Sequence, residues 1–218
     1  MIPTPSPNFG PRRNGPLVDL LVLHYTGMAS AAEALARLCD PAAEVSAHYL
    51  IDEDGTVHAL VDEAMRAWHA GRGWWRGETD VNSRSIGIEL VNPGHEFGYR
   101  PFPATQIAAL TALAAGILAR HPIPPRNVVG HADVAPGRKR DPGELFPWRE
   151  LAAAGIGLWP APAVAGSDPM AMLAAHGYDI TDAGAAIAAF QRHFRPARVD
   201  GVIDAETAAL MAGLTPAA

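Results

Sequence analysis

Residues 130–143, with the sequence GHADVAPGRKRDPG, contain side chains that could hold a metal ion. His131 and Asp141 are both of the types that ligate zinc in proteins. Proline restricts the backbone and glycine frees it, so Pro136, Gly143 and their neighbours can shape a loop that presents both side chains inward. We therefore interpret this segment as half of a zinc site.

A third candidate ligand is His24, near the end of the segment VDLLVLHYT. This continuous apolar run with β-branched members is typical of a buried central strand. A single histidine there is more often a hydrogen-bonded buried side chain, but the presence of His131 and Asp141 favours a ligand. Two histidines and one carboxylate leave the fourth tetrahedral position of zinc open for water, as in catalytic sites. The sequence thus predicts one hydrolytic zinc ion per chain.

Two further side chains could act on the reacting groups. Glu89 lies in the apolar strand pattern SIGIELV, where a carboxylate needs a partner or a function, so we interpret it as the general acid/base. Lys139 precedes Asp141 by two residues, and an extended loop would put both side chains on one side. Its ammonium would then lie near a developing oxyanion. Taken alone, Lys139 would more often be a solvated member of the basic run 138–140.

The elements that must position these residues alternate between strand and helix patterns. Ser30 can cap a helix that ends before Pro41, and the dipeptide Asp54-Gly55 is a strong signal for the turn of a hairpin. Mixed strands and helices of this kind predict an α/β (α+β) fold, with a mixed central β-sheet flanked by helices. The expected strands are 18–26, the two arms of a hairpin within 46–63, 85–92 and 127–131, and the expected helices are 30–40 and 105–121.

The composition changes abruptly after Trp159. Residues 159–167 are rich in proline, alanine, glycine and serine, which is typical of a linker. Beyond it, three short helical patterns can begin at Asp168, at Thr181 or Asp182, and at Asp204. We therefore expect a catalytic domain over residues 1–158, followed by a small three-helix domain over residues 168–218.

Charge and composition limit the class of partner. The chain has 218 residues, with 17 Lys and Arg against 23 Asp and Glu, and its net charge of -6 argues against nucleic acid or an anionic membrane as the main partner. Its single cysteine excludes an intrachain disulfide framework. No apolar run is long enough to span a bilayer, and the amino terminus lacks the pattern of a secretory signal. We expect a cytoplasmic monomer, or a periplasmic protein if a leader was removed.

The chain contains, in this order, the segments LVLHYT, SAHYLIDEDGTVHALVDE, AWHAG, SIGIELVNP and GHADVAPGRKRDPG. Together they resemble the zinc-dependent N-acetylmuramoyl-L-alanine amidases over roughly residues 15–150, and they are similar to the AmpD and AmiD branch, which shares its fold with the peptidoglycan recognition proteins. The C-terminal segments FQRHF, VDGVID and AETAAL resemble, more loosely, the three-helix peptidoglycan-binding module attached to many cell-wall hydrolases.

The resemblance implies a role for each of the candidate residues. His24, His131 and Asp141 match the zinc ligands of the family, Glu89 its acid/base and Lys139 its transition-state-stabilising lysine. It also implies that His69 lines the substrate groove, and we expect Trp68 and Asn92 to contact the substrate there. The implied substrate is peptidoglycan or a muropeptide, and the implied reaction is hydrolysis of the amide between N-acetylmuramic acid and L-alanine. Intact wall, soluble fragments and 1,6-anhydromuropeptides all stay open as substrates.

Two other functions are compatible with the same residues. A muropeptide-recognition protein would use the fold as a binding groove without catalysis, and loss of a zinc ligand would be its mark. A hydrolase for another amide or peptide bond would keep the metal site. All three candidate ligands, Glu89 and Lys139 are present, so the sequence favours the amidase.

Overall fold

The computed structural model describes residues 1–13, 15, 17–164 and 168–214. Its centre is a six-stranded sheet in the order β1-β5-β4-β7-β3-β8, in which the four consecutive strands β4, β7, β3 and β8 run parallel and β8 forms one edge. A separate antiparallel pair, β2 and β6, lies beside it. The strands are β1 (Ile2–Pro3), β2 (Phe9–Pro11), β3 (Leu20–Tyr25), β4 (Tyr49–Ile51), β5 (Val57–Ala59), β6 (Met65–Ala67), β7 (Ser85–Leu90) and β8 (Val128–Gly130).

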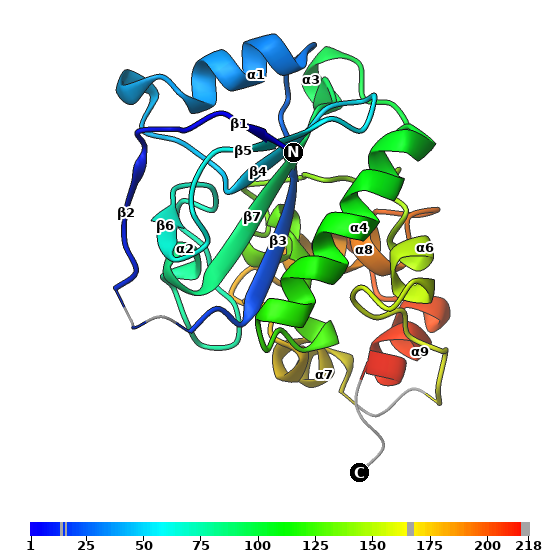
Figure 1. Ribbon diagram of the computed structural model, residues 1–218. Coiled ribbons are helices and arrows are strands. Elements are labelled where there is room, and N and C mark those ends of the chain that lie inside the picture. The colour runs from blue at the N-terminus through cyan, green and yellow to red at the C-terminus, as the bar shows by residue number, and fades with distance from the viewer. Residues whose placement is uncertain (14, 16, 165–167, 215–218) are drawn as a thin grey trace.

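Helices flank the sheet on both faces, with α1 at one end of the molecule and α7 and α9 grouped at the other (Figure 1). Several of them are single turns. The helices are α1 (Ala31–Leu38), η1 (Pro41–Ala43), α2 (Val81–Arg84), α3 (Gly94–Phe97), α4 (Ala104–Arg120), η2 (Pro125–Asn127), α5 (His131–Val134), α6 (Trp148–Ala153), α7 (Pro169–His176), α8 (Ala183–Phe194) and α9 (Ala205–Leu214).

The two faces of the sheet belong to different hydrophobic cores because side chains alternate along each strand. On one face, Leu21 and Leu23 of β3 pack with Leu110 and Ile117 of α4. On the other, Leu20 and Val22 pack with helices from the C-terminal part of the chain. His24 continues the second series, so it projects from the face that the C-terminal helices cover in part.

The predicted fold class is confirmed, as are the elements that carry the candidate residues. Ser30 caps α1 by accepting a hydrogen bond from the backbone N–H of Glu33. The hairpin joins β4 to β5, and Gly55 at its turn has a φ of +88°, which glycine adopts without strain. The short strands β1, β2 and β6 were not predicted, and β1 and β2 each contain a proline, which argues against a strand.

The three C-terminal helices begin near their predicted capping residues. Asp168, Asp182 and Asp204 each accept a hydrogen bond from a backbone N–H three residues further on. These helices share one hydrophobic core with the sheet, in which Phe190 and Leu173 join Val22 of β3. The division into domains 1–158 and 168–218 stays a prediction, and residues 165–167 of its linker and 215–218 at its end lie outside the described residues.

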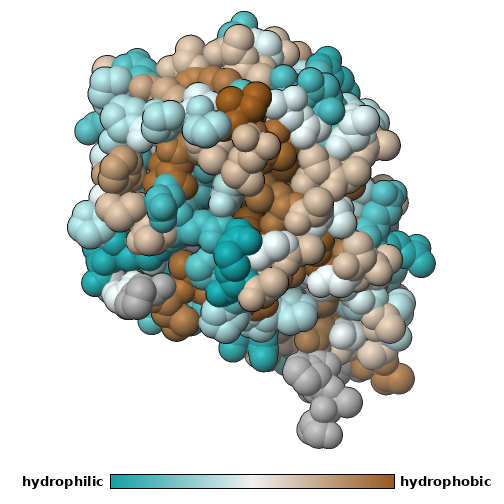
Figure 2. Space-filling model, in the orientation of Figure 1, coloured by the Kyte–Doolittle hydropathy of each residue, from teal (hydrophilic) through white to brown (hydrophobic). Residues whose placement is uncertain are grey.

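The surface of the protein carries both hydrophobic and hydrophilic side chains (Figure 2). Figure 2 shows groups of hydrophobic side chains near the middle of the face that carries α4, bordered by hydrophilic ones. The exposed side chains of Met1 and Ile2 contribute apolar area at the amino terminus. In the part of the chain that the structure describes, no helix is long and apolar enough to cross a membrane.

Candidate active site

The register of three neighbouring strands brings the candidate residues together. In the parallel pair of β3 and β7, His24 lies directly opposite Glu89. In the pair of β3 and β8, Leu23 lies opposite Gly130. The residues that follow them in the sequence, His24 and His131, are therefore also neighbours. The site therefore forms at the carboxyl ends of adjacent parallel strands, with His24 in the middle.

His24, His131 and Asp141 form a buried cluster in which each residue offers one ligand atom, and these three atoms lie within 4.8 Å of one another. The two Nδ1 atoms are 3.0 Å apart, and Oδ2 of Asp141 lies 3.1 Å from that of His24 and 3.0 Å from that of His131. Two imidazole nitrogens and a carboxylate oxygen that converge in this way are a ligand set that zinc accepts. The described part of the chain can therefore bind a metal ion here.

The protonation states of His24 and Asp141 are those that favour the binding of a metal cation. Burial, followed by the neighbouring His131, lowers the pKa of His24 to about 4, so its ring is neutral near pH 7. Burial alone would raise the pKa of Asp141, but the two histidines outweigh it and hold that pKa below its ordinary value, so the carboxylate is charged. Metal ligands need these forms, a neutral imidazole and an ionised carboxylate.

The hydrogen bonds of His131 give a second indication. Its Nε2 lies 3.0 Å from the backbone carbonyl oxygen of Ala70, which only accepts, so Nε2 carries the ring proton and donates it. A neutral ring protonated on Nε2 presents a lone pair on Nδ1, toward the carboxylate of Asp141. In that form the Nδ1 lone pair and Oδ2 of Asp141 face each other at 3.0 Å, and a metal ion bound here could take both as ligands.

Glu89 shares the pocket with the cluster. In the described part of the chain, its Oε2 atom is buried without a hydrogen bond. Burial raises the pKa of Glu89 well above its ordinary value, Asp141 raises it further, and the ammonium of Lys139 acts in the opposite direction. A carboxyl group with a raised pKa in a cleft is suited to exchange protons near neutral pH.

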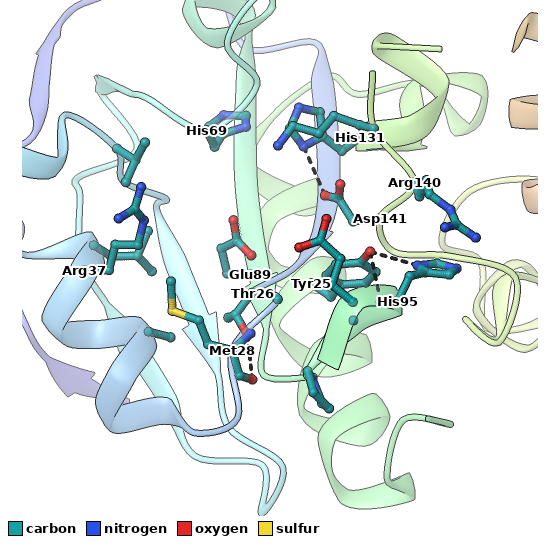
Figure 3. A pocket seen from close by; sticks show the side chains of 18 of the residues that line it. Tyr25, Thr26, Met28, Arg37, His69, Glu89, His95, His131, Arg140 and Asp141 are labelled. Atoms are coloured by element: carbon teal, nitrogen blue, oxygen red, sulfur yellow. Dashed lines mark hydrogen bonds and ion pairs between the residues drawn. The ribbon is translucent and has the colours of Figure 1, made fainter. Parts of the chain in front are cut away.

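The pocket lies between α1 and the loop that follows α5. Figure 3 shows Glu89, His131 and Asp141 directed into it, with Arg37 of α1 on one wall and Arg140 on the opposite wall. Arg138 and Lys139 also line it, so several cations surround the buried cluster. Such a rim favours a substrate that carries carboxylates.

The residues predicted to contact the substrate occupy different places. Trp68 and His69 line the pocket, although His69 is only 9 % exposed. Asn92 is completely buried. Its side-chain amide donates to the carbonyl of Arg100 and accepts from the N–H of Gly94, so it holds the turn before α3. A substrate contact of Asn92 stays a prediction, and this geometry does not favour it.

One wall of the pocket was not predicted from the sequence. The hydroxyl oxygen of Tyr25 lies 2.8 Å from Nδ1 of His95, and Nε2 of the same ring lies 3.0 Å from Oε2 of Glu144. Tyr25 and His95 line the pocket (Figure 3). Tyr25 directly follows His24, so its place could have been suspected, but His95 lies in the single-turn helix α3 and Glu144 in a turn, and no sequence pattern connects them.

Comparison with known proteins places these features in a family context. A family model described as N-acetylmuramoyl-L-alanine amidase matches residues 13–144. The chain is 42% identical to the N-acetylmuramoyl-L-alanine amidase AmiD of Escherichia coli K12, over 91% of this chain and 83% of AmiD. It is 34% identical to the 1,6-anhydro-N-acetylmuramyl-L-alanine amidase AmpD of Haemophilus influenzae, over 66% of this chain and 85% of AmpD.

Solved structures show the same similarity. The structure of E. coli AmiD in complex with the substrate anhydro-N-acetylmuramic acid-L-Ala-D-gamma-Glu-L-Lys superposes with a TM-score of 0.82 at 41% identity, covering 93% of this chain and 92% of AmiD. AmpDH3 of Pseudomonas aeruginosa superposes with a TM-score of 0.82 at 37% identity, covering 96% of this chain and 93% of AmpDH3. Coverage this high extends beyond residue 158, so the likeness includes C-terminal helices.

Proposed function

The chain belongs to the N-acetylmuramoyl-L-alanine amidase family, and from this premise we propose that His24, His131 and Asp141 hold a catalytic zinc ion. The reaction is hydrolysis of the amide between N-acetylmuramic acid and the L-alanine that begins the stem peptide. The observation that supports the metal site most directly is the convergence of three buried ligand atoms within 4.8 Å. The residues around that point then have the roles set out below.

Hydrolysis of an amide needs a strong nucleophile, a polarised carbonyl and a protonated leaving amine. A zinc ion bound here would supply the first two, because it lowers the pKa of a bound water to about 7 and acts as a Lewis acid. Glu89 supplies the third as the general acid/base, accepting a proton from water and delivering it to the departing nitrogen. Its raised pKa suits both steps.

Lys139 has the role of an electrostatic partner for the oxyanion. It lines the same pocket as Glu89 and Asp141. Its ammonium stabilises negative charge that grows on the carbonyl oxygen as the bond to the carbonyl carbon forms, and this charge is larger in the transition state than in the substrate. Lys139 therefore acts mainly on turnover.

For the substrate, we propose soluble muropeptides, including 1,6-anhydromuropeptides. The relatives support this choice, because AmiD was solved with an anhydromuropeptide and AmpD is named for that substrate. The cationic rim formed by Arg37, Arg138 and Arg140 would attract the carboxylates of the stem peptide. Trp68 would lie against the sugar or the first residues of the peptide.

The test is an assay of purified protein on an anhydromuropeptide and on intact wall, with release of the stem peptide followed by chromatography. Chelation should abolish release and added zinc should restore it, and His24→Ala should be inactive at every zinc concentration. His58→Ala is the control, because His58 is on β5 and does not line the pocket. If wild-type protein releases no stem peptide at any zinc concentration, the proposed site is wrong.

Two further expectations concern the oligomeric state and the cellular location of the protein. Size-exclusion chromatography with light scattering should give the mass of a monomer, 23.0 kDa. Fractionation of cells that express the native protein should recover it with cytoplasmic markers. Recovery with periplasmic markers would instead place the reaction at the cell wall.

A further inference from the structure

We propose that His69 and the backbone carbonyl of Ala70 are positioning partners of the two histidine ligands, which keep each ligand's Nδ1 directed at the metal. The inference rests on the proposed zinc site and assigns a function to the segment AWHAG, residues 67–71, beyond lining the substrate groove. Histidine ligands in general donate their second ring N–H to such a partner, which fixes the tautomer and the ring orientation.

The first contact concerns His131. Its Nε2 lies 3.0 Å from the carbonyl oxygen of Ala70, and a carbonyl oxygen only accepts, so Nε2 carries the proton. Nη2 of Arg138 donates to the same oxygen at 2.7 Å, which leaves the second lone pair of that oxygen occupied as well. This carbonyl is therefore held from two sides and can orient the His131 ring.

The second contact concerns His24, whose ring lies between the cluster and His69. Nδ1 of His24 is on the side of the cluster, and its Nε2 lies 3.0 Å from Nδ1 of His69. On the far side of the His69 ring, Nε2 lies 3.1 Å from the hydroxyl oxygen of Ser85. When Nδ1 of His24 is used as a metal ligand, the assignment that satisfies this chain is that His24 donates from Nε2 to His69 and His69 donates from Nε2 to Ser85.

The sheet contains a space that fits the His69 ring. A Cβ atom at Gly87 would lie 2.5 Å from Cγ of His69, so no other residue at this position of β7 would allow the ring to lie where it does. Ser85 and Gly87 alternate with Ile86 along the strand and face the same side as Glu89. The strand that carries the proposed acid/base thus also carries the seat for the positioning histidine.

The side chain of Asn82 holds the backbone segment that supplies both partners. The side-chain oxygen of Asn82 accepts hydrogen bonds from the backbone N–H of His69 at 3.2 Å and of Ala70 at 2.8 Å. Asn82 is 4 % exposed, so these bonds are shielded from water. Both ligand partners therefore belong to one rigid turn, and a change in that turn would affect both histidines together.

The inference is tested by measuring zinc affinity, by competition with a chromophoric chelator, on folded protein without substrate. His69→Leu removes the acceptor for His24 and should weaken zinc binding by about 10- to 100-fold. His69→Asn places an amide oxygen where Nδ1 was, so it should bind zinc close to the wild-type level. Circular dichroism confirms that each variant is folded before its titration.

His48→Leu is the matched control for this pair. The His48 ring is also buried and lies 5.8 Å from that of His69, but its hydrogen-bond partners are Gly87, Met65 and Arg12 and not a metal ligand. This variant should lose stability and keep its zinc affinity. If His69→Leu fails to fold, Ser85→Ala takes its place, because it removes only the far acceptor and should weaken zinc binding several-fold.

Three results would count against the inference. Wild-type affinity in folded His69→Leu or in Ser85→Ala would overturn it, and so would equal losses in His69→Leu and His69→Asn, since packing and not the acceptor would then be responsible. Failure of the wild-type protein to bind zinc would have a different meaning. It would refute the metal site itself, and this inference with it.

Discussion

At the scale of single residues, a substitution of Glu89 should impair catalysis without impairing metal binding. Glu89→Gln keeps the shape of the side chain and removes its ability to take and return a proton. We expect kcat/KM to fall by about 10²- to 10⁴-fold, while zinc affinity stays near the wild-type value, because Glu89 is not part of the ligand cluster. Glu150→Gln, on α6 outside the pocket, is the control. Near-normal turnover of Glu89→Gln would remove Glu89 from the mechanism.

Lys139 and Arg140 are neighbouring cations of the same loop that should differ in kinetic effect. Lys139→Met should lower kcat by about 10²- to 10³-fold with little change in KM, because the ammonium acts on charge that develops in the transition state. Arg140→Met should chiefly raise KM, since its guanidinium would attract a carboxylate already present in the substrate. Steady-state kinetics of both variants decide the matter, and the reverse pattern would exchange the two roles.

At the scale of elements, Glu63 ties the hairpin to the end of α4. Its carboxylate accepts hydrogen bonds from Tyr49 of β4 at 2.7 Å and from Arg120 at the end of α4 at 2.7 Å, and it lies 2.7 Å from Nε2 of His121. Burial alone would raise the pKa of Glu63, but these partners outweigh it and lower the pKa to about 2. The ionised form therefore stabilises the folded protein.

The lowered pKa predicts a pH dependence for Glu63→Gln. A carboxyl group with a depressed pKa in the folded state contributes stability above its ordinary pKa, near 4.5, and that contribution is lost as the pH falls toward about 2. At pH 7 the variant should lose about 1–3 kcal/mol in free energy of unfolding, measured with urea. The difference from wild type should shrink between pH 4.5 and pH 2, and a constant difference would contradict the pKa argument.

At the scale of the whole molecule, a buried polar network links the C-terminal helices to the segment of residues 130–143. Asp133, two residues after His131, accepts hydrogen bonds from the hydroxyl of Tyr178 and the N–H of Gly130, each at 2.7 Å. Nδ1 of His193 lies 2.7 Å from the same carboxylate. The network connects α5 with α8 and with the segment after α7, next to the core that these helices share with the sheet.

This connection predicts that the chain unfolds as one unit. Calorimetry should show a single transition, and Tyr178→Phe should shift that whole transition downward, with a loss of about 1–3 kcal/mol for the unpaired carboxylate oxygen. Two transitions, of which only one responds to Tyr178→Phe, would instead support the independent three-helix domain that the linker composition predicts. The peptidoglycan-binding module that these helices resemble in sequence is compatible with either result.

The sequence by itself determined the nature of the candidate chemistry and the elements that carry it. His24 and Glu89 could be placed on buried strands because a short, continuous apolar run indicates a buried strand. Helix α4 could be predicted because its apolar residues recur at helical spacing. The capping residues of the C-terminal helices were also identifiable, because a cap is a contact between residues three apart. All of these features depend on local interactions.

Only the tertiary structure decided how those residues meet. The strand order β7-β3-β8 sets His24 between Glu89 and His131, and strand order follows from long-range packing that no local pattern encodes. The contacts of His69 with His24, of Asn82 with the AWHAG turn and of Asp133 with Tyr178 join residues far apart in the chain. Residue types and spacing could name the candidate ligands, but the groups that contact them become visible only where the folded chain brings distant segments within hydrogen-bond reach.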